Sequence, residues 1–538
     1  MPLLGALADL VEGCCSLPGL VRSSALPLRS VEALVRALGD DIEPCGDGVR
    51  LRAEAAPRYR AALRLDTAAR ADPAAFATPG SHPLPAELLA LVTDLVSRAP
   101  RAKRHLDHVS ATPETVLRRA LFLDARFSLP GARVLLVGDH DLTSLALAAV
   151  QPEVEIVVVD IDDDVLDHIE TSAAARGWTL RSRFADLRAG LPDAVTGWAD
   201  LVITDPPYTR DGVGLFAARG LEALASAPHG RLVLAYGYGD QPALGAKVED
   251  ALRGLGLVHE AIYPAFNRYE GAQAVGSASN LYVLRPTRGT GRPRGGSPPP
   301  AHLYTSGPQS IEAAHGDLAR ATEEALTETA TASGSPLTLA VGARWSTTIR
   351  SAASVVTLAE ALAQPTQQPQ MPSRPAPGSV IVDLWHDPGP LLLRLLLTLD
   401  APVVAVLVAN RHPNLADEAG QRRLQRTLAA KYHLRYRRSR PSNDLAIVEA
   451  GLVDDKQLAP PQRAVRLLLE RPHTMVRNVL RDALIDAARR RGEPLTKNEA
   501  RAQVGPVLQG VDADATAATL SWNRLDEVLA RLADLRLA

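Results

Sequence analysis

A chain of 538 residues is too long for one hydrophobic core, so we expect roughly three or four domains. Lys and Arg total 59 against 61 Asp and Glu, and this balance argues against a protein whose main task is to coat nucleic acid or an anionic membrane. The 3 cysteines, Cys14, Cys15 and Cys45, lack a metal-type spacing with histidines, so we predict neither a metal site nor a disulfide framework.

The apolar segments predict no secretion signal and no membrane span. The N-terminal stretch MPLLGALADLVEGCC lacks a basic leading segment and contains Asp9 and Glu12, which argues against a signal peptide. The most apolar later stretch, Leu391 to Leu399, is interrupted by Arg394 and falls short of the roughly 20 residues that a membrane helix needs. We therefore predict a cytoplasmic protein without membrane contact.

Residues 1–80 predict a small winged-helix-like domain. A helix near Ser30–Leu38 precedes two strand-like runs around a Gly-Asp-Gly turn, and a helix followed by a hairpin is typical of a winged helix. Arg36, Arg50 and Arg52 form only a thin basic face, so packing or dimer contacts are favoured over DNA binding. We expect a homodimer and no nucleic-acid partner.

Connecting helices are predicted for residues 81–115, and a Rossmann-like domain for residues 116–286. In the second region, strand-like apolar runs alternate with helical stretches: RVLLVG, EIVVVDID, ADLVITDPPY, RLVLAYG and SNLYVLRP. Continuous apolar runs separated by helices predict an α/β domain whose mostly parallel sheet is covered on both faces. Ligands of such sheets bind at the carboxyl ends of the strands.

The predicted strand ends carry the candidate site residues. They are Gly138, Asp139, His140 and Asp141 after the first strand, Asp160 and Asp162 after the second, Asp186 after a short strand, and Asp205, Pro206 and Tyr208 after the fourth. An acidic residue at the position of Asp160 accepts hydrogen bonds from ribose hydroxyls. Asp186 fits an adenine amino group or, equally, a helix cap. We predict that Gly138, Asp160, Asp162 and Asp186 bind a nucleoside.

The stretch Asp205-Pro206-Pro207-Tyr208 predicts a site for an amine nucleophile. Its prolines stiffen the turn and donate no backbone hydrogen bonds, so the Pro206 carbonyl and the Asp205 carboxylate can accept from one donor-rich group. Tyr208 offers a ring face to a base or an ammonium group. Alignment of the two reactants supplies much of the catalysis in such displacements. A purely structural turn is the alternative.

The loop after the first predicted strand distinguishes between sulfonium donors. S-adenosylmethionine enzymes place a Gly-rich turn here, whose amides meet the methionine carboxylate. This chain has only Gly138, and Asp139 and Asp141 would repel a carboxylate and attract an ammonium group. Decarboxylated S-adenosylmethionine is therefore the favoured co-substrate, with capping by both aspartates as the alternative. His140 is either a base for the acceptor amine or a hydrogen-bonding spacer.

Several segments, in order, resemble the bis(aminopropyl)spermidine synthase family, which makes branched-chain polyamines. They are LDHVSATPETVLRRALFL, VLLVGDHDLTSLALA, VVDID, DLR and TDPPYTRDGVGLFAARG, and the resemblance spans residues 1 to about 286. It implies an N-terminal winged-helix-like unit, a Rossmann-like catalytic domain, and aminopropyl transfer from decarboxylated S-adenosylmethionine to a spermidine nitrogen, with methylthioadenosine as the second product.

The resemblance also implies that acidic residues of a Gly-Asp-Asp-Asp motif do catalytic work. Here the motif reads Gly138-Asp139-His140-Asp141, so an imidazole replaces one carboxylate. The family catalytic roles would fall to Asp139, His140, Asp141, Asp205, Pro206 and Tyr208. Because a negative charge is lost, the acceptor is left open as spermidine, another polyamine or another amine.

Two alternatives from other classes remain. An S-adenosylmethionine-dependent N-methyltransferase is suggested by the Asp-Pro-Pro-Tyr stretch, but the missing Gly-rich loop and the lack of a strongly basic surface count against it. A non-catalytic winged-helix regulator that senses a nucleoside or a polyamine is the other alternative. Retention of all the acidic strand ends counts against a sensor.

The C-terminal half carries no resemblance. A linker is predicted at residues 287–309, a second α/β unit at 310–455 with a Pro- and Gln-rich linker at 364–379, and a helical region at 460–538. Asp383, His386 and Asp387 follow one predicted strand, and a loop with ordinary helix caps is favoured there over a site.

Overall fold

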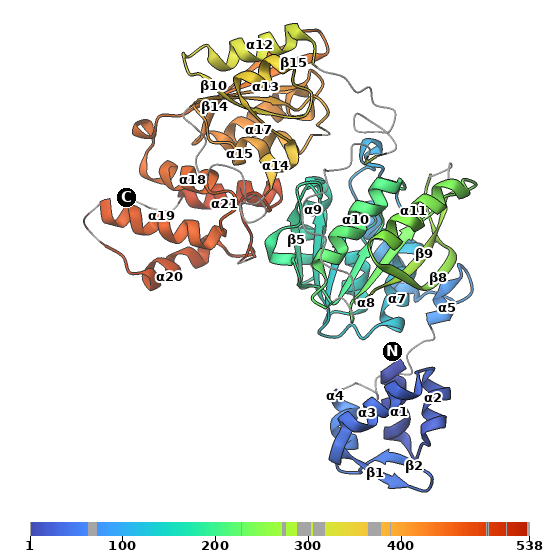
Figure 1. Ribbon diagram of the computed structural model, residues 1–538. Coiled ribbons are helices and arrows are strands. Elements are labelled where there is room, and N and C mark those ends of the chain that lie inside the picture. The colour runs from blue at the N-terminus through green and yellow to red at the C-terminus, as the bar shows by residue number, and fades with distance from the viewer. Residues whose placement is uncertain are drawn as a thin grey trace. The chain divides into compact units, whose positions relative to one another are not determined.

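The computed structural model describes residues 2–62, 73–226, 229–271, 276–287, 303–304, 318–363, 378–387, 389–490, 492, 494–512 and 514–534 (Figure 1). The chain divides into two compact units, Met1–Pro83 with Arg118–Pro130, and Leu84–Leu117 with Gly131–Ala538. Most of the predicted linkers 287–309 and 364–379 lies outside the described residues. Ser379, predicted as the last linker residue, is the first residue of a strand.

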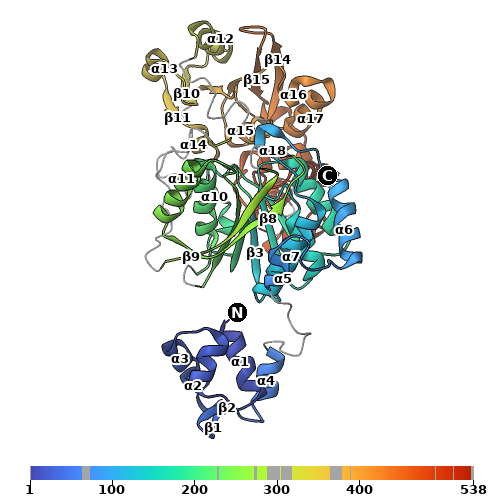
Figure 2. The same ribbon diagram turned by 90° about the vertical axis from the view of Figure 1, so that its right-hand side faces the viewer.

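The N-terminal unit builds helices on a short hairpin. Its elements are α1 (Pro2–Glu12), α2 (Leu17–Ser24), α3 (Leu28–Leu38), β1 (Ile42–Cys45), β2 (Gly48–Leu51), α4 (Ala56–Ala62) and α5 (Pro73–Ala77). The predicted helix is α3, and the predicted strand-like runs are the antiparallel pair β1 and β2. Figure 2 shows α1 to α4 gathered against this hairpin. The assignment of this unit as a winged helix stays a prediction.

Cys14 and Cys45 form a disulfide, so the expectation of no disulfide is wrong. The hairpin folds back on the segment between α1 and α2, where Cys15 and Val49 exchange backbone hydrogen bonds of 3.0 Å. That pairing brings two cysteines 31 residues apart in sequence together, which spacing alone did not reveal. Cys15 remains a free thiol.

The predicted Rossmann-like sheet is present, with the strand order β5-β4-β3-β6-β7-β9-β8. The strands are β3 (Arg133–Val137), β4 (Glu155–Asp160), β5 (Leu180–Phe184), β6 (Leu201–Thr204), β7 (Arg231–Tyr236), β8 (Leu257–Arg268) and β9 (Ala278–Pro286). Strands β3 to β7 are parallel, and β9 and β8 add an antiparallel edge. The sequence pattern missed β8, because this edge strand is half exposed and contains Pro264.

Helices cover both faces of this sheet. They are α6 (Ala86–Ser97), α8 (Thr143–Val150), α9 (Asp163–Ala174), α10 (Arg210–Ala223) and α11 (Pro242–Gly254), and α7 (Pro113–Arg126) begins in the same unit. Figure 2 shows α10 and α11 on one face and α6 on the opposite face. The residues of β4 and β6 are almost all buried, as expected of parallel strands between two helical layers. Strands β4 and β6 therefore carry polar side chains only at their ends.

The C-terminal half contains a second sheet, with the order β11-β10-β12-β13-β15-β14. Its strands are β10 (Leu337–Val341), β11 (Ser354–Val356), β12 (Ser379–Asp383), β13 (Val403–Ala409), β14 (Tyr432–Arg438) and β15 (Leu445–Leu452). Its helices are α12 (Arg320–Thr331), α13 (Thr347–Ala352), α14 (Leu358–Leu362), α15 (Leu391–Thr398), α16 (Pro413–Ala416) and α17 (Glu418–Leu428). The predicted helical region follows as α18 (Pro460–Glu470), α19 (Val476–Arg490), α20 (Lys497–Val507) and α21 (Trp522–Asp534).

The second sheet repeats the strand order of the first with one edge strand missing. In chain order, β10, β11, β12, β13, β14 and β15 occupy the positions of β3, β4, β6, β7, β8 and β9, and β5 has no counterpart among the described strands. The directions also agree, because β11, β10, β12 and β13 are parallel while β15 and β14 are antiparallel. In neither half does a described helix have the length and apolarity to cross a membrane.

Candidate functional site

The loop after β3 begins with a left-handed turn at Gly138, whose φ is +74°. A side chain there would also meet Phe216, since a Cβ atom would lie 3.2 Å from its ring. Asp139 is buried next in the chain, and its carboxylate accepts a hydrogen bond of 3.1 Å from the Ser144 N–H at the start of α8. Burial raises the pKa of Asp139 well above its ordinary value. Asp139 therefore caps α8, as the alternative interpretation held.

Asp141 holds a neighbouring segment in place. Its Oδ1 accepts a hydrogen bond of 2.8 Å from the Ala111 N–H. Ala111 also forms a bridge with Tyr269, just beyond β8, so Asp141 links the end of β3 to the end of the edge strand. Each of the two aspartates thus has a backbone partner, and their selection of a cationic tail stays a prediction.

Asp160 joins the ends of β3 and β4. Its carboxylate accepts hydrogen bonds from the Asp139 N–H at 2.9 Å and from the Asp162 N–H at 2.8 Å. Burial raises the pKa of Asp160 to about 6, against the lowering effect of these N–H donors. A carboxylate offers about four lone-pair sites, so capacity remains for a ribose hydroxyl. The position fits the predicted role.

A cluster of basic side chains lies beside these carboxylates, and the sequence analysis did not predict it. Lys103 Nζ lies 2.6 Å from Asp162 Oδ1 and 2.7 Å from Asp164 Oδ2. The ring of His108 stacks on that of His140, with centroids 4.1 Å apart and planes 17° apart. The available signal was the run KRHLDH at residues 103–108, which combines Lys, Arg and His just before the family-like segment.

His140 is a weak base in this environment. Burial lowers its pKa to about 4, although Asp162 and Asp205 act in the opposite direction. Its Nε2 lies 3.5 Å from Ser110 Oγ, which is at the limit of a hydrogen bond. A general base works best when its pKa lies near the working pH. The lowered pKa therefore argues against the proton-accepting role of His140 and leaves the hydrogen-bonding role.

Asp205 follows β6 and is the end of a chain of hydroxyl groups. Its Oδ1 accepts from Tyr208 Oη at 3.0 Å, and its Oδ2 accepts from Tyr269 Oη at 2.8 Å. Tyr269 Oη lies 2.9 Å from Ser279 Oγ, which in turn accepts from Asn267 Nδ2 at 2.9 Å. Because Asn267 can only donate through Nδ2, the Ser279 and Tyr269 hydroxyls are directed towards Asp205.

Tyr208 remains a protonated donor. Burial, followed by the charge of Asp205, raises the pKa of Tyr208 well above its ordinary value. Tyr269 is also buried. The structure thus brings Asp205 and Tyr208 together and adds Tyr269 as a second hydroxyl that orients the carboxylate.

The Asp186 carboxylate forms an ion pair and is not a free acceptor. Arg188 binds both of its carboxylate oxygens, with Nε at 2.9 Å from Oδ1 and Nη2 at 2.5 Å from Oδ2. Tyr304 is buried close to this pair and to Asp160, and burial is the main reason that its pKa is raised. The adenine-binding role of Asp186 stays a prediction, and its carboxylate already has a cationic partner.

Leu303 and Tyr304, predicted within a linker, are packed against the first sheet's ligand-binding end. They form a buried cluster with Leu106, and Ile161 and Phe216 pack against it. The Leu303 carbonyl accepts a hydrogen bond of 3.0 Å from Thr209 Oγ1, at the start of α10. The chain after β9 therefore returns to the loops that carry the candidate site.

The two carboxylates at and just after the end of β12, in the second sheet, bind neighbouring side chains. Arg344 binds both carboxylate oxygens of Asp383, at 2.8 and 2.7 Å. Asp387 caps α15 through the Leu392 N–H at 3.0 Å and also lies 3.0 Å from His412 Nε2. Asp387 thus caps a helix, whereas Asp383 is the partner of an arginine, and the preference for a loop without a site stays a prediction.

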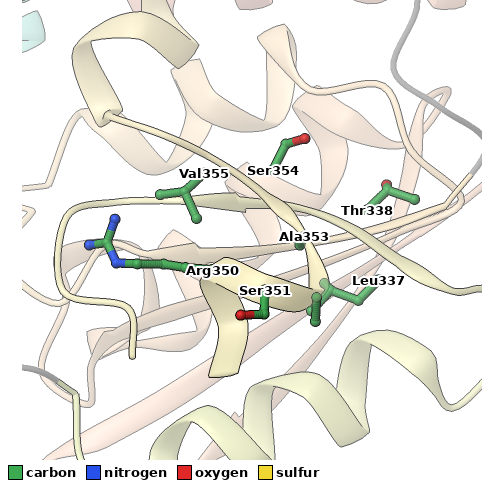
Figure 3. A pocket seen from close by; sticks show the side chains of 8 residues that line it. Leu337, Thr338, Arg350, Ser351, Ala353, Ser354 and Val355 are labelled. Atoms are coloured by element: carbon green, nitrogen blue, oxygen red, sulfur yellow. The ribbon is translucent and has the colours of Figure 1, made fainter. Parts of the chain in front are cut away.

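A groove of about 600 Å³ lies at the opposite end of the second sheet (Figure 3). It is lined by Leu337–Thr338 at the start of β10 and by Arg350–Val355, which lead into β11. Ligands of parallel sheets bind at the carboxyl ends of the strands, and this groove lies at the amino ends. The first sheet therefore carries the candidate site.

Residues 87–328 match the model of a family described as branched-chain polyamine synthase A C-terminal domain. This match covers a little less than half of the chain, so it shows a similarity to that family over these residues. An uncharacterised protein of Methanocaldococcus jannaschii, MJ0675, is 37% identical over 201 residues, which cover 37% of this chain and 50% of that protein. The N(4)-bis(aminopropyl)spermidine synthase of the same organism is 36% identical over 139 residues, covering 26% of this chain and 40% of the relative.

The curated matches are partial, since the chain spans half or less of the length of these relatives. The N(4)-bis(aminopropyl)spermidine synthase of Thermococcus kodakarensis is 34% identical over 140 residues, again 40% of its length. Among solved structures, the branched-chain polyamine synthase of Thermus thermophilus, in complex with N4-aminopropylspermidine and 5′-methylthioadenosine, has a TM-score of 0.34. It is 23% identical, and the match covers 54% of this chain and 90% of that structure.

Proposed function

We propose that this protein is an aminopropyltransferase. It moves the aminopropyl group of decarboxylated S-adenosylmethionine to a nitrogen of a polyamine such as spermidine, and it releases a branched polyamine and methylthioadenosine. The observation that carries this proposal is the match of residues 87–328 to the branched-chain polyamine synthase model, together with the similarity to curated N(4)-bis(aminopropyl)spermidine synthases. The acidic strand ends of the first sheet support it.

In the proposed reaction, a neutral secondary amine attacks the carbon bonded to the sulfonium sulfur. The C–N bond forms as the C–S bond breaks, and the electron pair of that bond returns to sulfur, which leaves as the neutral thioether. The product is a protonated tertiary amine, so the only proton that must leave does so before the attack. Positioning of the two reactants is therefore the main catalytic task.

Asp205 is the proposed orienting group for the acceptor. Its carboxylate is held by the hydroxyls of Tyr208 and Tyr269, and an acceptor N–H that binds it directs the nitrogen lone pair away from the carboxylate. The same carboxylate stabilises the positive charge that grows on nitrogen during the attack. The Pro206 carbonyl is the proposed second acceptor, and His140 is assigned a hydrogen-bonding role.

Asp160 is the proposed partner of the donor ribose, and Asp139, Asp141 and Asp162 supply negative potential around the cationic tail. Burial favours the protonated form of Asp139 and Asp160, and a bound ammonium group would favour the ionised form again. These aspartates would repel the carboxylate of S-adenosylmethionine. This argument supports the decarboxylated donor.

The test is an acceptor screen with mass detection of the products. We expect methylthioadenosine and a branched polyamine when the protein is incubated with decarboxylated S-adenosylmethionine and spermidine. Absence of methylthioadenosine across a series of polyamine acceptors would contradict the proposal.

Calorimetry separates the proposal from the methyltransferase alternative, because tighter binding of S-adenosylmethionine than of the decarboxylated form would favour methyl transfer. Ligand-dependent DNA binding without turnover would favour the regulator.

A further inference from the structure

The first residue of α9, Asp163, is held by the C-terminal half of the chain. Its Oδ1 accepts a hydrogen bond of 2.7 Å from Arg394 Nη2, on α15, and one of 2.9 Å from the Trp522 N–H, at the start of α21. The Arg394 side chain is only 2% exposed, and its guanidinium carbon lies 4.0 Å from the centroid of the Phe184 ring. A buried ion pair and a stacked ring thus meet at the start of α9.

The same half also covers the open edge of the first sheet. Strand β5 is the last strand on its side, and the Phe184 N–H at its end donates to the Thr519 carbonyl at 2.7 Å. Arg183, one residue earlier, forms an ion pair with Asp512. Asp512 and Thr519 therefore satisfy a side-chain group and a backbone group that an exposed edge strand would leave to solvent.

The start of α9 is tied directly to the candidate nucleoside site. Asp162, immediately before it, caps α9 through the Asp164 N–H at 3.0 Å and also binds Lys103. Its own N–H donates to Asp160, the proposed ribose partner. A shift of α9 would thus move Asp160, Asp162 and Lys103 together.

Burial disfavours the charges of this ion pair, so each charge depends on its partner. Burial raises the pKa of Asp163, while Arg394 and the Trp522 N–H lower it. Removal of one partner of a buried pair leaves an uncompensated charge, whereas removal of both is often tolerated. The pair is therefore sensitive to the exact placement of α15 against α9.

At two described positions, the strand ends of the second sheet differ from those that carry the candidate nucleoside site of the first sheet. The strand that corresponds to β4 is β11, and Thr357 follows it where the first sheet ends in Asp160. Thr357 is engaged in a capping box with Glu360. Asp383 corresponds to Asp205, the residue that follows β6, and its carboxylate forms an ion pair with Arg344. Both of these positions in the second sheet are therefore engaged by neighbouring side chains.

We propose that the C-terminal half is a positioning domain for the nucleoside site of the first sheet, and that Arg394 is its main positioning residue. Arg394 holds Asp163, and Asp163 fixes the turn Asp160–Asp162 and the start of α9. A displacement of about 1 Å at a site that must align two reactants can cost about 100-fold in rate. The identity of the nucleoside rests on the proposed function.

The experiment uses the full chain with methylthioadenosine as the probe. Arg394→Leu should weaken methylthioadenosine binding at least tenfold in calorimetry and should accelerate hydrogen exchange at the backbone amides of residues 161–166. Arg344→Leu is the matched control, because Arg344 also pairs with a buried carboxylate and also lies over an aromatic ring, that of Trp385, at 4.9 Å. This control should leave binding and the exchange of α9 within twofold of the wild-type values.

Where Arg394→Leu fails to fold, the double variant Asp163→Asn/Arg394→Met removes both charges and keeps the test available. It should fold and still bind methylthioadenosine at least threefold more weakly than the wild type. Wild-type affinity in a folded variant, or equal losses in Arg344→Leu, would overturn the positioning role. If the wild type itself binds no methylthioadenosine, the proposed function fails. The hydrogen exchange of α9 in Arg394→Leu then still tests whether Arg394 positions α9.

Discussion

The hydroxyl chain that ends at Asp205 makes a sharp prediction for Tyr269→Phe. The substitution removes the hydrogen bond of 2.8 Å to Asp205 Oδ2 and leaves the ring in place. A hydrogen bond to a charged group contributes about 1.5–3 kcal/mol. If that energy orients Asp205 in the transition state, kcat falls about 10- to 150-fold. The KM for the donor should change less than twofold, because the nucleoside contacts are untouched.

The assay is methylthioadenosine release under saturating acceptor, with unfolding by urea as a parallel measurement. Tyr236→Phe is the matched control, since Tyr236 is a buried tyrosine whose Oη has no hydrogen-bond partner among the described residues. Loss of an unsatisfied hydroxyl should leave kcat unchanged and should raise the free energy of unfolding by about 1 kcal/mol. Unchanged activity in Tyr269→Phe, or an equal loss in Tyr236→Phe, would refute the reasoning.

Four further predictions follow from the site. Asp205→Ala should reduce transfer more than 100-fold in the same release assay, while calorimetry should find methylthioadenosine affinity within a few-fold of the wild-type value. Asp141→Asn keeps an oxygen that can accept from the Ala111 N–H, so the free energy of unfolding should change by less than about 1 kcal/mol. Because the charge is lost, its KM for the cationic donor should rise about tenfold. The pKa of Asp160 is about 6, so its carboxyl is protonated below that pH, and donor affinity measured by calorimetry should rise between pH 5 and pH 7. His140→Asn should leave the pH dependence of kcat unchanged between pH 6 and pH 8, and a shifted profile would restore His140 as a base.

The pKa of His140 also has a consequence for stability. Its folded-state pKa of about 4 lies below the unfolded value of 6.5, so the wild type loses stability as pH falls from 6.5 to 4. The contribution is about 3 kcal/mol at most, and urea unfolding of His140→Asn should lack this part of the acid dependence.

The sequence alone was sufficient for the parallel strands of the sheet that carries the site. The runs of β3, β4, β6 and β7 are continuously apolar because parallel strands are buried on both faces, and this pattern is local. The residue that follows each run then lies at the ligand-binding edge, which is why Asp160 and Asp205 could be predicted. The exposed edge strand β8 has no such pattern and was missed.

Only the tertiary structure decided which side chains meet. Lys103 and Asp162 are 59 residues apart, Cys14 and Cys45 are 31 apart, and Arg394 and Asp163 are 231 apart. Hydrophobic periodicity reports which face of an element is buried, but such pairs depend on how whole elements dock. For the same reason, the sequence could not show that the C-terminal half contacts the start of α9.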